Sequence, residues 1–401
     1  MVLFLKKKKK MNKNYKIAVI IQRFGKEVLG GSETLAFKVA KILAKEHKVT
    51  VLTTTAKEHT TWKNYWEPGE YSEEGIKVKR FWVDFPRSSY WEILNQILLK
   101  FAGSIEKLRN LPLNFCREWV KYQGPYSSEL FKYLKKTEYD KYIFFTYLYP
   151  TTFFGIETVL KKGVEKEKIY FVPTYHQEPP AYLPVFLEYQ ELKHLFLTKA
   201  EAKLAINIYQ KEPKYQMLGF GMEDHYAKYA HFEKKDFVIY AGRIEQGKGV
   251  KELVEYFRKF YKRYPKVKLY LIGRGKLNRN LSEGVVYKGF VDEKEKLRLL
   301  REARVFIHPS PYESLGIVLL EAFMMGTPGL VNGKCEVLRE HIEKSGAGKV
   351  YNSYEEFEKK LKELLKGKEY EALQRKARKY FIENYSMEQF KRRVKKIIKE
   401  E

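Results

Sequence analysis

Two carboxylates, Glu313 and Glu321, stand in the stretch HPSPYESLGIVLLEAFMMGTP, residues 308–328. Glu313 lies in a loop rich in Ser, Pro and Tyr, and Glu321 lies in an apolar run of helical character. The run RVFIH, residues 304–308, precedes the loop and predicts a strand. A carboxylate on an apolar helix needs a partner when it is buried. A ribose with two neighbouring hydroxyl groups would supply one.

The start of the predicted helix would present backbone N–H groups and a partial positive charge to an anion. Ser314, Leu315 and Gly316 stand at that start, and such N–H groups commonly bind phosphate. Glu313 beside them would accept hydrogen bonds from the hydroxyl groups of a neutral ligand part. The pattern therefore suits a ligand that is part polyol and part phosphate.

A second group of candidates lies in AGRIEQGKG, residues 241–249, where a strand enters a glycine-containing loop before a helix. In an α/β domain such a loop lies at the carboxyl end of the sheet, where ligands bind. Arg243 and Lys248 at this place predict a clamp for a diphosphate. The loop is not a Walker A motif, which has the pattern GxxxxGK[ST]. The alternative is two solvated cations in a chain with 77 Lys and Arg.

Strand and helix patterns alternate along the chain and predict two α/β domains in tandem. The expected strands of the first series are residues 15–21, 49–54, 76–82, 139–147, 168–173 and 203–208. Those of the second are residues 236–243, 267–273, 285–290, 304–308 and 329–331. A polar, irregular stretch near residues 219–235 separates the two series and predicts the domain boundary.

This alternation divides the chain into a basic tail (residues 1–14), a first domain (15–225), a second domain (226–375) and a basic C-terminal helix (376–401). The C-terminal helix is expected to pack back toward the first domain. Residues 88–123 interrupt the first series with helical sequence rich in large apolar and aromatic groups. They predict either a helix pair packed on the domain or a surface for a lipid-linked acceptor or the membrane interface.

The composition narrows the class of protein. The 401 residues are 44% hydrophobic and carry a net charge of +27, which is spread over both halves. Such charge favours anionic partners, namely nucleotides, acidic lipid surfaces or nucleic acid, although a charge-rich thermophile surface is an alternative. No apolar run reaches the roughly 18 residues of a membrane span. Two cysteines exclude a disulfide framework, so we expect a cytoplasmic protein, with peripheral contact to an anionic membrane as an option.

The three blocks 241–249, 289–290 and 308–328, in this order and spacing, closely resemble the C-terminal domain of family 4 retaining glycosyltransferases of the GT-B fold. In the first half, GGSE at residues 30–33 resembles the Gly-rich loop of that family, and YHQEPP at residues 175–180 resembles its active-site histidine loop. The resemblance covers most of residues 15–345. It implies two Rossmann-like domains that face each other across a cleft.

The resemblance also implies roles for single residues. Arg243 and Lys248 would hold the donor diphosphate, and Glu321 would bind the nucleotide ribose. Glu313, with the N–H groups of residues 314–316, would hold the transferred sugar and its phosphate. In the first half, the resemblance assigns Gly31 to the loop that approaches the diphosphate. His176 would lie beside the sugar, with a structural loop histidine as the alternative reading.

The family often has Gly-Phe-Gly where this chain has Ser314, Leu315 and Gly316, so the bulk of Leu315 bears on the choice of sugar. Its usual His-Asp pair is His176 and Gln177 here. These departures concern the identity of the donor sugar and the acceptor more than the class of reaction.

No metal or other cofactor is expected. The five aspartates, Asp84, Asp140, Asp224, Asp236 and Asp292, do not form the Asp-x-Asp motif that holds a metal in the other main glycosyltransferase fold. Arg243, Lys248 and the helix start would then stabilise the leaving nucleoside diphosphate.

The resemblance thus implies a retaining, metal-independent glycosyltransferase that uses a nucleotide-sugar and a glycan or lipid-linked acceptor in cell-surface polysaccharide or lipopolysaccharide synthesis. One alternative is a GT-B enzyme that acts on nucleotide-sugars without transfer, such as an epimerase. A nucleic-acid-binding protein is a less favoured alternative because no recognisable binding module is present. An oxidoreductase is weak because the first strand–helix turn has no GxGxxG pattern.

Overall fold

The computed structural model describes residues 14–28, 30–275, 283–366 and 369–399. Most of the predicted basic tail, residues 1–13, lies outside the described residues. The chain forms two compact units. The first runs to Pro173 and includes Pro179–Leu195, and the second comprises Thr174–Glu178 and the chain from Phe196 onward. The predicted boundary at residue 225 falls within this second unit.

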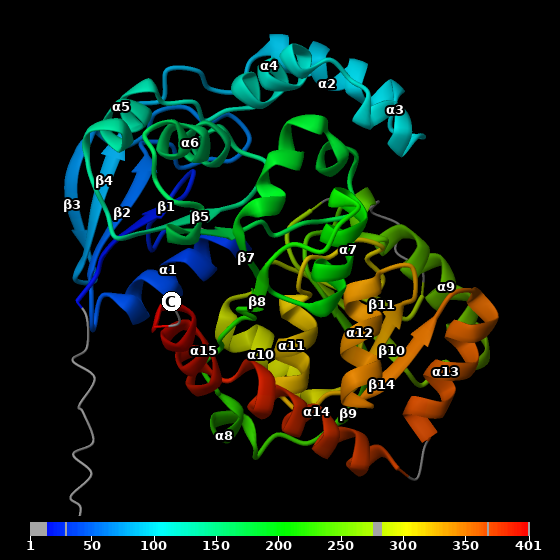
Figure 1. The fold of residues 1–401 in the computed structure, drawn as a ribbon. Coiled ribbons are helices and arrows are strands. Elements are labelled where there is room, and N and C mark those ends of the chain that lie inside the picture. Colours follow the sequence, from blue (N-terminus) through cyan, green and yellow to red (C-terminus); the bar gives the residue numbers. More distant parts are fainter. Residues whose placement is uncertain (1–13, 29, 276–282, 367–368, 400–401) are drawn as a thin grey trace, which may run out of the picture. The chain divides into compact units, whose positions relative to one another are not determined.

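The first unit is built on a sheet with the strand order β3-β4-β2-β1-β5-β6-β7. Its strands are parallel except for β3, which pairs antiparallel with β4. Helix α1 lies on one face of the sheet, and α5 and α6 lie on the other (Figure 1). Strand β1 is central and buried from its second residue onward, because both faces of a parallel sheet are covered by helices.

The strands of this unit are β1 (Lys16–Ile20), β2 (Lys48–Thr54), β3 (Gly69–Glu73), β4 (Ile76–Phe81), β5 (Lys141–Phe145), β6 (Ile169–Val172) and β7 (Lys193–Phe196). The helices are α1 (Gly31–Leu43), α2 (Ser89–Lys100), α3 (Ile105–Arg109), α4 (Leu113–Gln123), α5 (Ser128–Lys136) and α6 (Pro150–Lys161), with the 3-10 helices η1 (Lys166–Lys168), η2 (Pro179–Tyr182) and η3 (Pro184–Glu191).

The interruption at residues 88–123 is helical, as predicted, and forms α2, α3 and α4. Helices α2 and α4 pack against each other through Trp91 and Trp119, whose ring centroids lie 6.1 Å apart. The indole N–H of Trp119 donates to Asn95 Oδ1 at 3.3 Å. Residues 88–123 therefore contain a packed helix pair.

The second unit is built on a six-stranded sheet with the order β11-β10-β9-β12-β13-β14, in which all described pairings are parallel. The strands of this sheet are β9 (Lys235–Ala241), β10 (Lys268–Ile272), β11 (Val285–Gly289), β12 (Ala303–His308), β13 (Gly329–Asn332) and β14 (Gly348–Tyr351). The unit also contains the short strand β8 (Tyr215–Met217), which is not part of this sheet. The two parallel sheets confirm the predicted α/β class.

The helices of the second unit are α7 (Lys199–Tyr209), α8 (Tyr226–Tyr229), η4 (Gln246–Lys248), α9 (Val250–Arg263), α10 (Glu293–Glu302), α11 (Ile317–Met324), α12 (Glu336–Ser345), α13 (Tyr354–Lys366), α14 (Tyr370–Tyr385) and α15 (Met387–Lys399). Apolar side chains of α9 and α13, among them Phe257 and Phe357, form one core with Val238 and Val305 of the sheet. None of the described helices is long and apolar enough to cross a bilayer.

The strand predicted at residues 203–208 is wrong, because these residues lie inside α7. Thr198 caps this helix through a hydrogen bond from the Glu201 N–H to its hydroxyl oxygen. Ala202, Ala205, Ile208 and Tyr209 are buried, which is a helical spacing and not the alternation of a half-buried strand. The strand of this region is β7, ten residues earlier.

The C-terminal helices α14 and α15 belong to the second unit. Arg393 of α15 donates to the Leu218 carbonyl at 2.9 Å, and Phe390 lies against Phe220 with ring centroids 6.4 Å apart. The chain end therefore packs on the segment that precedes β9. The predicted packing of residues 376–401 toward the first domain stays a prediction.

Candidate active site

The predicted site residues of the second unit gather where two neighbouring strands end. Strands β9 and β12 are adjacent and parallel, so their carboxyl ends meet at one edge of the sheet. The loop after β9 carries Arg243 and Lys248, and the loop after β12 carries Glu313. Lys248 and Glu313, which are 65 positions apart in the sequence, are thereby brought into contact.

A half-buried ion pair joins the two loops. Lys248 Nζ lies 2.7 Å from Glu313 Oε1, and both side chains are largely covered. The loops also meet at Gly249, which has φ +68° and precedes α9. A Cβ atom there would lie 2.4 Å from the Pro309 carbonyl oxygen, so the close approach requires glycine.

His308, the last residue of β12, also contacts Glu313. Its Nε2 lies 3.8 Å from Glu313 Oε1. Burial lowers the pKa of His308 to about 4, so the imidazole is neutral near pH 7. Burial alone would raise the pKa of Glu313, but the contacts with His308, Lys248 and Ser310 hold it below its ordinary value. Lys248 therefore provides the main charge that keeps Glu313 ionised.

Arg243 is exposed, unlike Lys248. Its guanidinium lies 3.3 Å from Glu245 Oε1 on the same loop. Its backbone carbonyl accepts a hydrogen bond from the Tyr240 hydroxyl at 2.7 Å. The loop is thus held through its backbone while the Arg243 side chain keeps the freedom to turn toward an anion.

The helix after Glu313 is α11, and its N-cap is Gly316 with φ +71°. A Cβ atom at Gly316 would lie 2.6 Å from Leu338 Cδ2 of α12, so glycine is needed for both its conformation and its packing. Ser314 is half-buried, and Leu315 is buried. Glu321 lies in the second turn of α11, and its Oε1 lies 2.7 Å from Lys296 Nζ of α10. This lysine is a partner that sequence reasoning missed.

His341 of α12 is a second residue that the sequence did not single out. Its Nε2 lies 2.7 Å from the Leu315 carbonyl oxygen, and its Nδ1 lies 3.0 Å from the Tyr380 hydroxyl. A carbonyl oxygen only accepts, so Nε2 carries the proton and Nδ1 accepts from Tyr380. The buried imidazole therefore links the loop before α11 to helix α14.

Acid should weaken the fold through His341. Burial lowers its pKa to about 4 from an ordinary value of 6.5. Between these values the unfolded chain binds more protons at His341, so the free energy of unfolding falls as the pH falls through this window, by roughly 3 kcal/mol at most. Urea unfolding at pH 7 and pH 5 should show a smaller loss for His341→Gln than for wild type. Replacing the exposed His231 by Gln should leave the wild-type loss unchanged.

His176 belongs to the second unit with these residues. It is half-buried and lies in a turn in which the Glu178 N–H donates to its carbonyl at 2.8 Å. Gly31 belongs to the first unit, where it is exposed and begins α1. Beside it, Glu33 forms a buried ion pair with Arg23 at 2.6 Å. The start of α1 is therefore anchored within its own unit.

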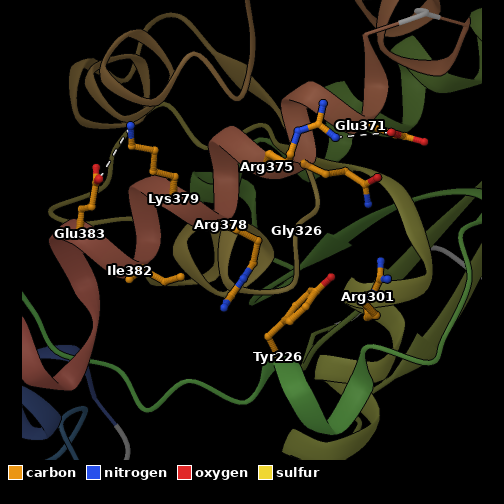
Figure 2. A pocket seen from close by; sticks show the side chains of 10 residues that line it. Tyr226, Arg301, Gly326, Glu371, Arg375, Arg378, Lys379, Ile382 and Glu383 are labelled. Atoms are coloured by element: carbon orange, nitrogen blue, oxygen red, sulfur yellow. Dashed lines mark hydrogen bonds and ion pairs between the residues drawn. The ribbon is translucent and has the colours of Figure 1, made fainter.

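A separate hollow of about 610 Å³ lies among α8, α10 and α14 (Figure 2). Arg378 points into it, with its guanidinium 4.3 Å from the centroid of the Tyr226 ring. Its nitrogens bind Asp224 at 3.0 and 2.8 Å and the Met324 carbonyl at 2.6 Å. Lys379 turns away toward Glu383. These contacts tie α14 to α8, and none of the predicted site residues is among those that line the hollow.

Residues 221–384 match the family model of glycosyl transferases group 1. MJ1607 of Methanocaldococcus jannaschii, an uncharacterized glycosyltransferase, is 30% identical over 122 residues, which are 27% of this chain and 31% of that protein. The alpha-monoglucosyldiacylglycerol synthase of Acholeplasma laidlawii is 31% identical over 132 residues, 31% of this chain and 33% of that protein. The matched region thus spans about a third of the length of these curated relatives.

The likeness in structure extends over nearly the whole chain. The structure of Anabaena Alr3699/HepE in complex with UDP and glucose has a TM-score of 0.63 at 14% identity, covering 96% of this chain and 99% of that chain. At this identity the likeness shows the fold, which is that of the GT-B glycosyltransferases.

Proposed function

Because residues 221–384 match the family model of glycosyl transferases group 1, we propose that the protein is a retaining, metal-independent glycosyltransferase. It would move a sugar from a nucleotide-diphosphate-sugar to a glycan or lipid-linked acceptor. The observation that carries the proposal is the half-buried Lys248–Glu313 pair, which puts a cation and a carboxylate that can accept hydrogen bonds from hydroxyl groups at the ends of β9 and β12. Parallel strand ends of this kind are where α/β domains bind ligands.

The proposed donor site divides by chemistry. Lys248 and Arg243 neutralise the diphosphate, with help from N–H groups at the start of α11. Glu313 accepts hydrogen bonds from the sugar, and Glu321 accepts them from the ribose. The half-buried His176 would lie by the sugar, and Gly31 would let the backbone beside it approach the diphosphate. A UDP donor is in keeping with the UDP named in the structure of the Anabaena relative.

The chemistry of the step follows from charge. The nucleoside diphosphate gains negative charge as its bond to the sugar breaks, and fixed positive groups stabilise that charge in the transition state. Lys248 is already held by Glu313, so little reorganisation is needed when the donor binds. The acceptor hydroxyl attacks on the face from which the diphosphate departs, which retains the configuration of the sugar.

Binding and product analysis together test the proposed function. We expect one of UDP, GDP and ADP, with its sugars, to raise the unfolding temperature well above the others, because stabilisation grows with ligand over its Kd. The sugar of that donor should then appear on an added glycan or lipid acceptor. Conversion of the nucleotide-sugar at an equal rate without acceptor would instead indicate an epimerase. Salt-sensitive DNA binding with no response to any nucleotide would indicate a nucleic-acid-binding protein.

Removal of metal ions should leave turnover unchanged. Arg243 and Lys248 provide positive charge where the other glycosyltransferase fold uses an Asp-bound metal, so the leaving group is stabilised without one. The measurement is the initial rate of transfer after dialysis against EDTA, compared with the rate in added Mg²⁺. Loss of the rate in EDTA and its recovery with Mg²⁺ would contradict the metal-independent mechanism.

The outer face of α2 could bind a lipid-linked acceptor or the surface of a membrane. Tyr90, Ile93 and Ile97 form an exposed row at helical spacing and are 42%, 56% and 37% exposed. Lys100 lies in the last turn of α2, and α3 adds Lys107 and Arg109 nearby along the chain. An apolar row beside cations suits the surface of an anionic membrane. The name of the Acholeplasma relative refers to a diacylglycerol product. We therefore propose a cytoplasmic enzyme with peripheral membrane contact that acts in cell-surface polysaccharide or lipopolysaccharide synthesis.

Replacing both Ile93 and Ile97 by Ser should weaken vesicle binding roughly tenfold or more, because about 0.8 kcal/mol is lost for each methylene no longer buried and each substitution removes at least one. The measurement is co-sedimentation with vesicles of phosphatidylglycerol and phosphatidylcholine. Ile382→Ser is the matched control, since Ile382 is also exposed but lies on α14. Equal sedimentation of the double variant and wild type would remove α2 as the membrane surface.

A further inference from the structure

A buried carboxylate, Glu201, lies in the first turn of α7 and is only 1% exposed. With Thr198 it has the S/T-x-x-E spacing of a capping box. Thr198 Oγ1 accepts a hydrogen bond from the Glu201 N–H at 3.0 Å, as such a box requires. The Glu201 side chain, however, reaches outside its own helix, which a cap alone does not need.

The two oxygens of Glu201 bind two separate segments. Oε1 accepts a hydrogen bond from the Tyr175 N–H at 2.9 Å, and Oε2 accepts one from the Leu197 N–H at 2.7 Å. Burial raises the pKa of Glu201, and the backbone N–H groups of Leu197, Tyr175 and Thr174, which bind the ionised form, oppose that rise. A buried carboxyl group of this kind costs folding free energy, so capping one helix is a weak reason for its presence.

The segment that Glu201 holds is strained. Thr174 has φ +55°, in the left-handed region that residues other than glycine rarely adopt. Such a conformation persists only where its surroundings enforce it, and it is common at functional sites. Tyr175 is held again through its hydroxyl, which lies 2.6 Å from the hydroxyl of Tyr209 in the last turn of α7. Both ends of α7 therefore fix this one tyrosine.

The next residue along the chain is His176. We infer that Glu201 is a positioning residue for His176, because its carboxylate fixes the strained Thr174–Tyr175 backbone and thereby sets where the imidazole lies. Glu201 itself, being buried, does not touch the donor. This inference rests on the proposed function for the place of His176 beside the sugar. The hydrogen bonds from Glu201 to the backbone do not depend on that function.

The decisive variant is Glu201→Gln, which keeps the shape of the side chain. Its NH2 group donates and does not accept, so one backbone N–H loses its acceptor and faces another donor. We expect kcat to fall about tenfold or more through misplacement of His176, while the KM for the donor stays close to that of wild type. On a His176→Ala background the same substitution should cause no further loss, since residues that act as one unit are not additive.

Glu340→Gln is the matched control. Glu340 of α12 accepts hydrogen bonds from the Lys199 and Ala200 N–H groups at 3.2 and 2.5 Å. It therefore supports the start of the same helix without contact to Tyr175. If Glu201 acted only by stabilising α7, both substitutions would lower turnover alike. A loss of kcat confined to Glu201→Gln supports the positioning role.

Hydrogen exchange tests the clamp without any need for activity. The Tyr175 amide should exchange roughly tenfold or more faster in Glu201→Ala than in wild type and Glu340→Ala, because alanine removes both oxygens of Glu201, including the one that accepts from this amide. Unchanged exchange at residues 174–176, or full additivity with His176→Ala, would overturn the inference. If wild type transfers no sugar from any nucleotide-sugar, the proposed function fails and the exchange result alone decides whether the clamp stands.

Discussion

Replacing Lys248 by Ala should lower kcat/KM for the nucleotide-sugar by about 10² or more, equivalent to roughly 3 kcal/mol of transition-state stabilisation. Two losses add in this variant. The cation nearest the proposed diphosphate disappears, and Glu313 loses the ion-pair partner that lies 2.7 Å away. Without that partner, burial raises the pKa of Glu313, so the group that should accept hydrogen bonds from the sugar becomes protonated more readily.

The measurement is initial transfer rates over a range of donor concentration. Lys251→Ala is the matched control, since Lys251 lies three residues along on the exposed side of α9 and should leave the rate unchanged. Circular dichroism would establish that the Lys248 variant is folded. A folded Lys248→Ala protein with the wild-type kcat/KM would show that the loops after β9 and β12 do not hold the donor.

Glu321→Gln should raise the donor KM and lower kcat/KM by something like 10², because an amide is a poorer acceptor for the two ribose hydroxyls than a carboxylate. Glu321→Gln also breaks the ion pair with Lys296, whose Nζ lies 2.7 Å from Glu321 Oε1, so a loss of activity has two possible causes. Lys296→Gln separates the two effects. It removes the same ion pair but leaves the carboxylate in place.

The measurement is the Kd of the free nucleoside diphosphate, obtained by calorimetry for Glu321→Gln and for Lys296→Gln. If Glu321 binds ribose, its Gln variant should weaken binding far more than Lys296→Gln. Equal weakening in both variants would mean that the ion pair acts only by holding α10 against α11. Tight binding by both variants would remove Glu321 from the donor site.

Several elements follow from local sequence alone. The apolar run at residues 15–21 predicts a buried strand. Strand β1 is that strand, and four of its five residues are buried. The helix after Glu313 follows from the apolar run at residues 317–324. Local sequence did not predict the structure of residues 203–208, which lie in α7 and not in a strand. The apolar residues of this region fit a short strand by composition, yet the Thr198 cap and the packing of Ala202, Ala205 and Ile208 make it helical.

The chain sequence by itself determined the two α/β series, the two loops that carry Arg243, Lys248 and Glu313, and the order of those loops along the chain. It determined them because strand, helix and cap signals are local. Only the tertiary structure decided that β9 and β12 are neighbours, which brings Lys248 to Glu313. Only the tertiary structure likewise brings Lys296 to Glu321, His341 to the Leu315 carbonyl and Glu201 to the Tyr175 N–H.

These partners carry no local signal, since Lys and Glu are abundant in this chain and the His341–Leu315 and Glu201–Tyr175 contacts join residues far apart in the sequence. Their physical reason is burial. A carboxylate or imidazole taken out of water must find a partner among whatever groups the packed elements bring within reach. The folded arrangement of strands and helices, and no spacing within the sequence, selects which groups those are.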